Sequence, residues 1–216
     1  MRKGKRPKLY LAGPEIFLPN AIEYANQQRA LCEKYGFIGL HPMDNNIDLG
    51  QRSMKTALKV YQCDVRQVRE CDIVVANCNL FRGALMDDGT AYELGYGNAL
   101  GKPSYGYINK KIGYVNRVTQ NYPWCEIERG VRADKDGYLL LDDFGAEINL
   151  MMQCGMTTNG GRLVIGDFES CLRAIRYDID GKTLKLGMIW WKKLRIKSRG
   201  ETKKSEETPP LFIPSK

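Results

Sequence analysis

The sequence predicts an α/β fold, a doubly wound parallel sheet of five strands with helices on both faces. Three observations support this. Short apolar runs alternate with longer segments of helical periodicity through the first hundred residues. The first apolar run closes with Gly-Pro, which ends strands. The length of 216 residues, with 43% hydrophobic and 27% charged residues, suits one well-buried soluble domain.

The elements can be placed in order along the chain. The expected strands cover residues 8–13, 37–42, 72–78, 102–108 and the apolar run that begins at 162. The expected helices cover residues 20–35, with Asn20 able to cap, then 52–70, about 90–100, and a last helix capped at Asp167. This is a flavodoxin- or Rossmann-like order, in which ligands bind beyond the carboxyl ends of the strands. The loops that begin at Gly13, Met43, Asn79 and Tyr107 should therefore share one edge.

Two segments fall outside this alternation. Residues 109–148 carry several turn signals and are expected to be an insertion or long loop. Residues 8–180 then form the domain, and 181–216 form a basic C-terminal extension whose last part has the composition of a disordered tail.

The charge distribution argues against a nucleic-acid partner. The net charge is +8, but residues 1–8 carry +5 and residues 182–216 carry +7, so the body between them is mildly acidic. The seven cysteines are scattered and contain no C-x-x-C, and His41 is the single histidine. We therefore expect no metal or other cofactor and no disulfide framework, but reduced thiols in the cytoplasm. No apolar run suits a membrane span or a secretory signal.

The segment "MDDGTAYELGYGNALGKP" holds the leading candidate residue, Glu93. Thr90-x-x-Glu93 matches a capping box, so Glu93 either caps a helix or does chemistry. Its helix is expected to start near Thr90, where free amide groups would favour the ionised carboxylate. Asp87 and Asp88 are either acids that raise a neighbouring pKa or ordinary turn residues. Asp64, on the preceding helix, taken alone is expected to be exposed to solvent.

Five segments together resemble the nucleoside 2-deoxyribosyltransferases: "LYLAGPEIF", "PMDNN", "CDVRQVRECDIVVA", "FRGALMDDGTAYELGYGNALGK" and "DFGAEINLM". The resemblance implies that Glu93 is a nucleophile and that the Tyr10 hydroxyl orients it. It implies that Asp64 and Asp87 hold the nucleobase, with Asp87 giving the leaving base its proton. The implied reaction moves 2-deoxyribose between nucleobases through a covalent deoxyribosyl-glutamate.

The same resemblance implies further binding positions. Asp44 and Asn46 match a loop that contacts the base, while Gly13 and Phe17 belong to a loop that wraps the nucleoside. Asn149 matches an asparagine that reaches the sugar in a neighbouring subunit's site. The implied partners are 2′-deoxyribonucleosides, free nucleobases and further copies of the chain.

Two alternatives remain open. One is an N-glycosidase that hydrolyses 2′-deoxynucleoside 5′-phosphates, which Glu15 disfavours because the first loop then holds an acid and no arginine. The other is a non-catalytic nucleotide-binding module. The chain continues well past residue 179, so Lys216 is not expected to supply a terminal carboxylate to the site. Arg82 is expected either to bind a phosphate or, preferably, to pair with local acids.

Overall fold

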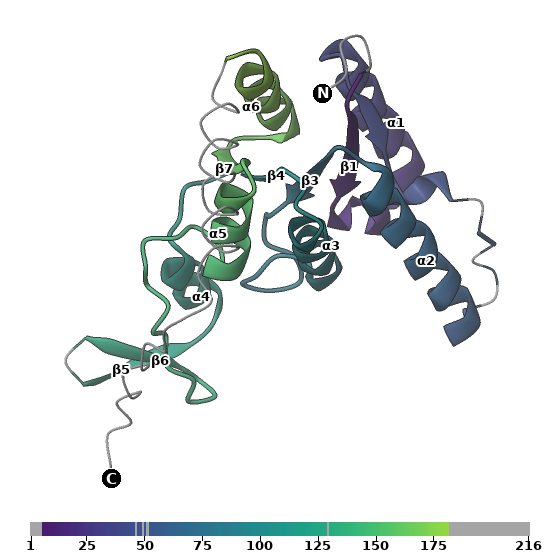
Figure 1. Ribbon diagram of the computed structural model, residues 1–216. Helices are drawn as coiled ribbons and strands as arrows, with labels where there is room; N and C mark the ends of the chain where they lie inside the picture. The colour runs from purple at the N-terminus through teal and green to yellow at the C-terminus, as the bar shows by residue number, and fades with distance from the viewer. Residues whose placement is uncertain (1–5, 46, 49, 51, 129, 182–216) are drawn as a thin grey trace, which may run out of the picture.

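The computed structural model describes residues 6–45, 47–48, 50, 52–128 and 130–181 (Figure 1). Five parallel strands form the main sheet in the order β2-β1-β3-β4-β7. These strands are β1 (Lys8–Ala12), β2 (Ile38–Leu40), β3 (Ile73–Asn77), β4 (Ser104–Ile108) and β7 (Arg162–Ile165). The predicted five-stranded parallel sheet is confirmed.

Helices and short 3-10 turns connect these strands. They are η1 (Pro14–Phe17), α1 (Ala21–Lys34), η2 (Pro42–Asp44), α2 (Met54–Glu70), α3 (Asp88–Ala99), α4 (Tyr114–Asn121), α5 (Leu150–Thr158) and α6 (Phe168–Asp180). Asp167 caps α6 as predicted, because its carboxylate accepts from the Ser170 amide. Asn20 precedes α1 without a side-chain capping bond, which the sequence did not anticipate.

The two faces of the sheet carry separate cores, because successive strand side chains point to opposite faces. Leu9 and Leu11 of β1 pack in a cluster that includes Phe37 and the α6 residues Leu172 and Ile175. The second cluster is formed by Tyr10 and Ala12 of β1, Val68 of α2, Leu94 of α3 and Met156 of α5. Helices therefore cover both faces, as the doubly wound prediction requires.

Residues 109–148 contain more structure than the expected insertion or long loop. They form α4 and an antiparallel hairpin of β5 (Trp124–Glu128) and β6 (Val131–Asp134). Figure 1 shows the hairpin at the end of the molecule farthest from α1 and α2. Both pieces are short, and α4 has only eight residues, so their periodicity is weak in the sequence.

Four cysteines are buried in the two cores: Cys32, Cys71, Cys78 and Cys171. Burial raises the pKa of the Cys32 and Cys78 thiols to about 12 and that of Cys71 to about 11. All seven cysteines are free thiols. Within the described residues, no helix combines the length and the apolar composition that a membrane span needs. Nor does this part of the chain bring three His, Cys, Asp or Glu side chains together as metal ligands. The predicted extension, 181–216, lies outside the described residues except for Gly181.

Candidate active site

The parallel sheet brings its loops to one edge, and the connections diverge between β1 and β3. After β1 the chain turns to α1 and β2 on one side, and after β3 it turns to α3 and β4 on the other. Such a switch point is where ligands bind in open α/β sheets. The candidate residues Tyr10 and Glu93 come from β1 and α3, the elements that flank this point.

The central contact is a hydrogen bond in which the Tyr10 hydroxyl donates to Oε1 of Glu93. The Tyr10 side chain is fully buried in the sheet, so its hydroxyl is held in place. The capping-box interpretation of Glu93 is wrong. The helix starts at Asp88, with Asp87 as its N-cap, which places Glu93 in the second turn rather than the first.

Burial sets the protonation of this pair. It raises the pKa of Glu93 to about 8, and the nearby charges of Asp64 and Asp87 add to the rise, while the Tyr10 hydrogen bond opposes it. The sequence had predicted the opposite, an ionised form stabilised by free helical amides. Burial and the Glu93 charge raise the pKa of Tyr10 far above its ordinary value, so the hydroxyl keeps its proton and remains a donor.

Asp64 faces the same pair from α2. Its expected exposure is not found, because the side chain is partly buried and its Oδ1 atom is shielded from solvent without a hydrogen-bond partner. Burial raises the pKa of Asp64 to about 6. A buried carboxyl oxygen without a partner is costly, which makes this atom a candidate for a hydrogen bond with a ligand.

Asp87 is buried and holds the start of α3. Its Oδ2 atom accepts from the amide and the hydroxyl of Thr90, both at 2.8 Å. Asp87 is therefore a helix cap as well as a candidate site residue, and its Oδ1 atom is not used by the cap. Asp88 is exposed and accepts from the Gly89 amide through its Oδ1 atom, as an ordinary residue at a helix start does.

Glu15 is a buried acid that the sequence did not identify as part of the site architecture. Its Oε1 atom accepts from Asn77 Nδ2 at 2.7 Å and from the Tyr107 hydroxyl at 2.9 Å. These bonds tie the first loop to the ends of β3 and β4. Gly13 fits this packing, because a Cβ atom there would lie 1.9 Å from Glu15 Oε2 and the Glu15 carboxylate would have to move. One sequence signal could have identified Glu15: it is an acid that comes directly after Gly-Pro at the end of a buried strand.

Phe17, Phe81 and Arg82 meet above the same edge. The two phenylalanine rings are stacked with centroids 5.4 Å apart. The Arg82 guanidinium carbon lies 4.9 Å from the centre of the Phe17 ring and 4.6 Å from that of Phe81. The expected pairing of Arg82 with acids is wrong, since it forms no ion pair with any residue that the structure describes.

Asp44 forms its contacts with residues outside the Tyr10–Glu93 pair. Its Oδ1 atom forms an ion pair with Arg29 of α1, and its Oδ2 atom accepts from the His41 amide at 2.8 Å. No hydrogen bond joins Asp44 to Tyr10 or Glu93 in the described part of the chain. Asn46, the other predicted residue of this loop, lies outside the described residues.

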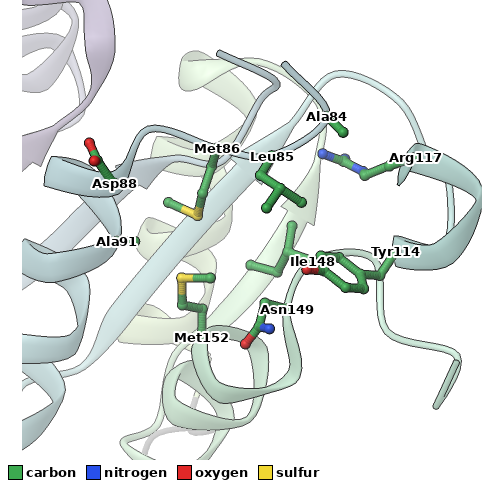
Figure 2. Close-up of a pocket in the computed structure, with 10 residues that line it drawn as sticks. All are labelled: Ala84, Leu85, Met86, Asp88, Ala91, Tyr114, Arg117, Ile148, Asn149 and Met152. Atoms are coloured by element: carbon green, nitrogen blue, oxygen red, sulfur yellow. The ribbon is translucent and has the colours of Figure 1, made fainter. Parts of the chain in front are cut away.

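Asn149 lies in a different place from Glu93. It caps α5 and lines a cavity of about 210 Å³ with a largely apolar wall that includes Met86, Ile148 and Met152, and with Arg117 at one side (Figure 2). Glu93 does not line this cavity. Ala91 and Asp88 of α3 do, and at 100° per residue they occupy the opposite side of that helix from Glu93. Within a single copy of the chain, Asn149 therefore lies on the opposite side of α3 from the Tyr10–Glu93 pair.

A family profile and a solved structure both relate this chain to the 2-deoxyribosyltransferases. The sequence profile described as Nucleoside 2-deoxyribosyltransferase matches residues 9–151. A 2-desoxiribosyltransferase from Leishmania mexicana has a similar structure, with a TM-score of 0.59 and 29% identity, over 79% of this chain and 97% of that one. An uncharacterized protein of Schizosaccharomyces pombe is 31% identical over 178 residues, which are 76% of this chain and 83% of that protein.

Proposed function

The chain belongs to the nucleoside 2-deoxyribosyltransferase family, and from this premise we propose that it transfers 2-deoxyribose between nucleobases through a covalent bond to Glu93. The observation that carries the proposal is the Tyr10–Glu93 hydrogen bond at the switch point of the sheet. It presents a carboxylate in a fixed orientation, which nucleophilic attack on an anomeric carbon requires.

The first half of the reaction breaks the bond between the base and the sugar. Positive charge develops on the anomeric carbon, and the Glu93 carboxylate stabilises that charge before bonding to the carbon. Tyr10 donates to one carboxylate oxygen, so the other oxygen is available for attack. A sugar without a 2′-hydroxyl reaches this cationic state more easily, which supports a 2′-deoxyribonucleoside as the donor.

The leaving base must gain a proton, and two acids stand near Glu93. Asp87 has one oxygen that its capping role does not use. Asp64 has a buried oxygen without a partner, and its pKa of about 6 keeps a fraction protonated near neutral pH. We assign to these two carboxyl groups the binding of the nucleobase and the proton transfer to it. A second base then attacks the intermediate from the side that the first base left.

A second copy of the chain completes each site in this proposal. Asn149 lies on the opposite side of α3 from Glu93, so it is better placed to serve another subunit's site than its own. Apolar side chains close to it in the sequence support a buried interface, since Phe144 and Met151 are each 73% exposed in the single chain. The substrates we propose are 2′-deoxyribonucleosides and free nucleobases.

The test is an exchange assay on the purified full chain. Thymidine or deoxyinosine is incubated with adenine or cytosine, and formation of the new deoxynucleoside is followed by chromatography. The Glu93→Gln variant should lose exchange, whereas Glu23→Gln, a change at an exposed position of α1, should retain it. A 2-fluoro arabino analogue followed by mass spectrometry should place the sugar on Glu93.

Two results would contradict the proposal. No exchange by the wild-type chain would remove the transferase assignment. Faster base release from a deoxynucleoside 5′-phosphate than from the nucleoside would favour the N-glycosidase alternative instead. We expect the nucleoside to react faster, because the buried carboxylate of Glu15 disfavours an anionic group near the first loop.

A further inference from the structure

Two aromatic rings and one arginine join the two segments that hold the proposed catalytic pair. Phe17 ends η1, seven residues after Tyr10. Phe81 and Arg82 lie in the connection between β3 and α3, ahead of Glu93. We call these three residues the FFR cluster; it links the first loop to the β3–α3 loop across the switch point of the sheet.

The contacts within the FFR cluster are specific. Phe17 is 53% exposed, yet its ring stacks on Phe81 with an interplanar angle of 17°. The Arg82 guanidinium lies within 5 Å of both ring centres, a distance at which cations are attracted to aromatic faces. No other link by aromatic stacking or a cation joins these two loops in the described residues.

The backbone of Arg82 supports a dedicated role. Among the described residues it is the one non-glycine with a positive φ, at 50°, which is an uncommon conformation for a long side chain. Strained backbone of this kind persists where the surrounding structure holds it, and it gathers at functional sites. Here the conformation places the guanidinium over two rings instead of against an acid.

The proposed chemistry creates a need for such a link. In transfer, a ring nitrogen of the second base bonds to the anomeric carbon, the Glu93 carboxylate leaves, and the base gives up a proton. In hydrolysis, a water oxygen bonds to the same carbon, the carboxylate leaves, and free deoxyribose and a proton are released. The two outcomes differ only in whether base or water reaches the intermediate, so excluding water favours transfer.

We propose that the FFR cluster is a latch that holds the two loops together over the glycosyl-enzyme and thereby sets the ratio of transfer to hydrolysis. This inference rests on the proposed function and adds positioning residues to it. Phe17, Phe81 and Arg82 act by keeping the loops closed and water out, while Tyr10 and Glu93 carry the chemistry.

The experiment measures both products in one reaction. The full chain is incubated with a deoxynucleoside and a second base, and the new nucleoside and the free deoxyribose are quantified together. The key variant is Arg82→Asn, because asparagine accepts a positive φ and the backbone can stay as it is. Arg82→Lys keeps the cation, and Phe81→Leu removes one ring.

A matched control is present in the hairpin. Arg132 lies 5.1 Å from the ring centre of Trp124, so Arg132→Asn removes a similar contact away from the Tyr10–Glu93 pair. We expect Arg82→Asn and Phe81→Leu to raise the ratio of hydrolysis to transfer by about fivefold, the change expected for a lost cation–aromatic contact. Arg82→Lys should restore most of the wild-type ratio, and Arg132→Asn should leave it unchanged.

The results separate the latch from the proposed function. If the wild-type chain transfers deoxyribose and Arg82→Asn gives the same product ratio, the latch is refuted and the transferase stands. If total turnover falls in Arg82→Asn while the ratio holds, Arg82 has a structural role only, and the latch is again refuted. If the wild-type chain releases no base from any deoxynucleoside, the proposed function fails first and the latch with it.

Discussion

A carboxylate attacks carbon only when it is ionised, and the surroundings of Glu93 oppose that ionisation. Burial and two neighbouring acids raise its pKa to about 8, with only the Tyr10 hydrogen bond acting the other way. The charge that the proposed chemistry needs is therefore held in a site that destabilises it. Such a conflict between stability and activity is common at catalytic residues.

This conflict predicts a variant that is inactive yet more stable. From about pH 4.5 to 8 the unfolded chain loses the Glu93 proton while the folded chain keeps it, so the wild-type free energy of unfolding falls across this window. The Glu93→Gln variant has no carboxyl group at this position, so its free energy of unfolding should not fall for this reason. Because one pKa unit is worth ~1.4 kcal/mol, urea unfolding at pH 8.5 should show the variant more stable by a few kcal/mol, with almost no difference at pH 4. An equal difference at both pH values would argue against a buried, protonated Glu93.

The same pKa predicts the pH dependence of the reaction. The proposed chemistry needs two protonation states at once, an ionised Glu93 and an acid that still holds a proton for the leaving base. The value of kcat/KM should therefore follow a bell-shaped dependence on pH, with one limb set by Glu93, whose pKa is raised to about 8. Asp64→Asn removes a negative charge that raises the pKa of Glu93, so the Glu93 limb should move to lower pH in that variant. Initial rates measured from pH 5 to 10 check both points. A limb that stays in place in Asp64→Asn would contradict the electrostatic link.

At the scale of elements, α3 is positioned by the absence of a side chain at one glycine. A Cβ atom on Gly97 would lie 2.5 Å from Cγ2 of Val74 in β3, while a Cβ on Gly95 would meet nothing within 4 Å. The helix that carries Glu93 therefore packs closely against the sheet at Gly97, whereas Gly95 has room for a side chain.

These two glycines form a matched pair of variants. Gly97→Ala should destabilise the fold by about 1–3 kcal/mol through overpacking, and should lower activity by displacing α3. Gly95→Ala should stabilise it by up to about 1 kcal/mol, because alanine is the better helix former. Thermal and urea unfolding measure both. Equal effects of the two substitutions would show that α3 does not approach the sheet as closely as described.

The sequence predicted the elements that carry apolar runs or clear helical periodicity, and it missed the hairpin, whose strands mix apolar and charged residues. Residues 73–77 and 54–70 carry strong apolar patterns, so the sheet and its main helices could be placed. The hairpin of β5 and β6 could not, because its strands, WCEIE and VRAD, contain charged residues and lack the apolar run that marks the buried strands of the main sheet. The start of α3 was misplaced because Thr90-x-x-Glu93 imitates a capping box, whereas Asp87 holds the cap.

The candidate site was predictable in its residue types but less so in their environment. Tyr10 and Glu93, 83 residues apart, meet because β1 pairs with β3 and α3 follows β3. Spacing alone could not reveal the burial of Asp64 or the direction of the pKa shift of Glu93, which depend on packing between α2, α3 and the sheet. Glu15 was noted only for its charge, since its partners Asn77 and Tyr107 are distant in sequence.

At the scale of the whole molecule, the separation of Asn149 from Glu93 predicts a site shared between copies. Glu93→Gln and Asn149→Ala chains should each be weak alone, yet mixing them after joint refolding should restore activity. In an assembly of two with sites shared across the interface, about a quarter of the sites in an equal mixture hold both intact residues. Exchange activity measured before and after refolding checks this. Activity that never exceeds the average of the two separate variants would place the complete site within one chain.

The alkylation rates of the buried cysteines can measure how often the folded chain opens. An alkylating reagent needs a thiolate, and Cys32, Cys71, Cys78 and Cys171 are sealed in the two cores with raised pKa values, whereas Cys125 and Cys154 are exposed. Labelling with iodoacetamide should therefore show a fast phase for the exposed cysteines and a slow phase for the buried ones. The rate of the slow phase would measure how often each face of the sheet opens to solvent. Comparing Cys32 with Cys78 would show which layer of helices detaches first.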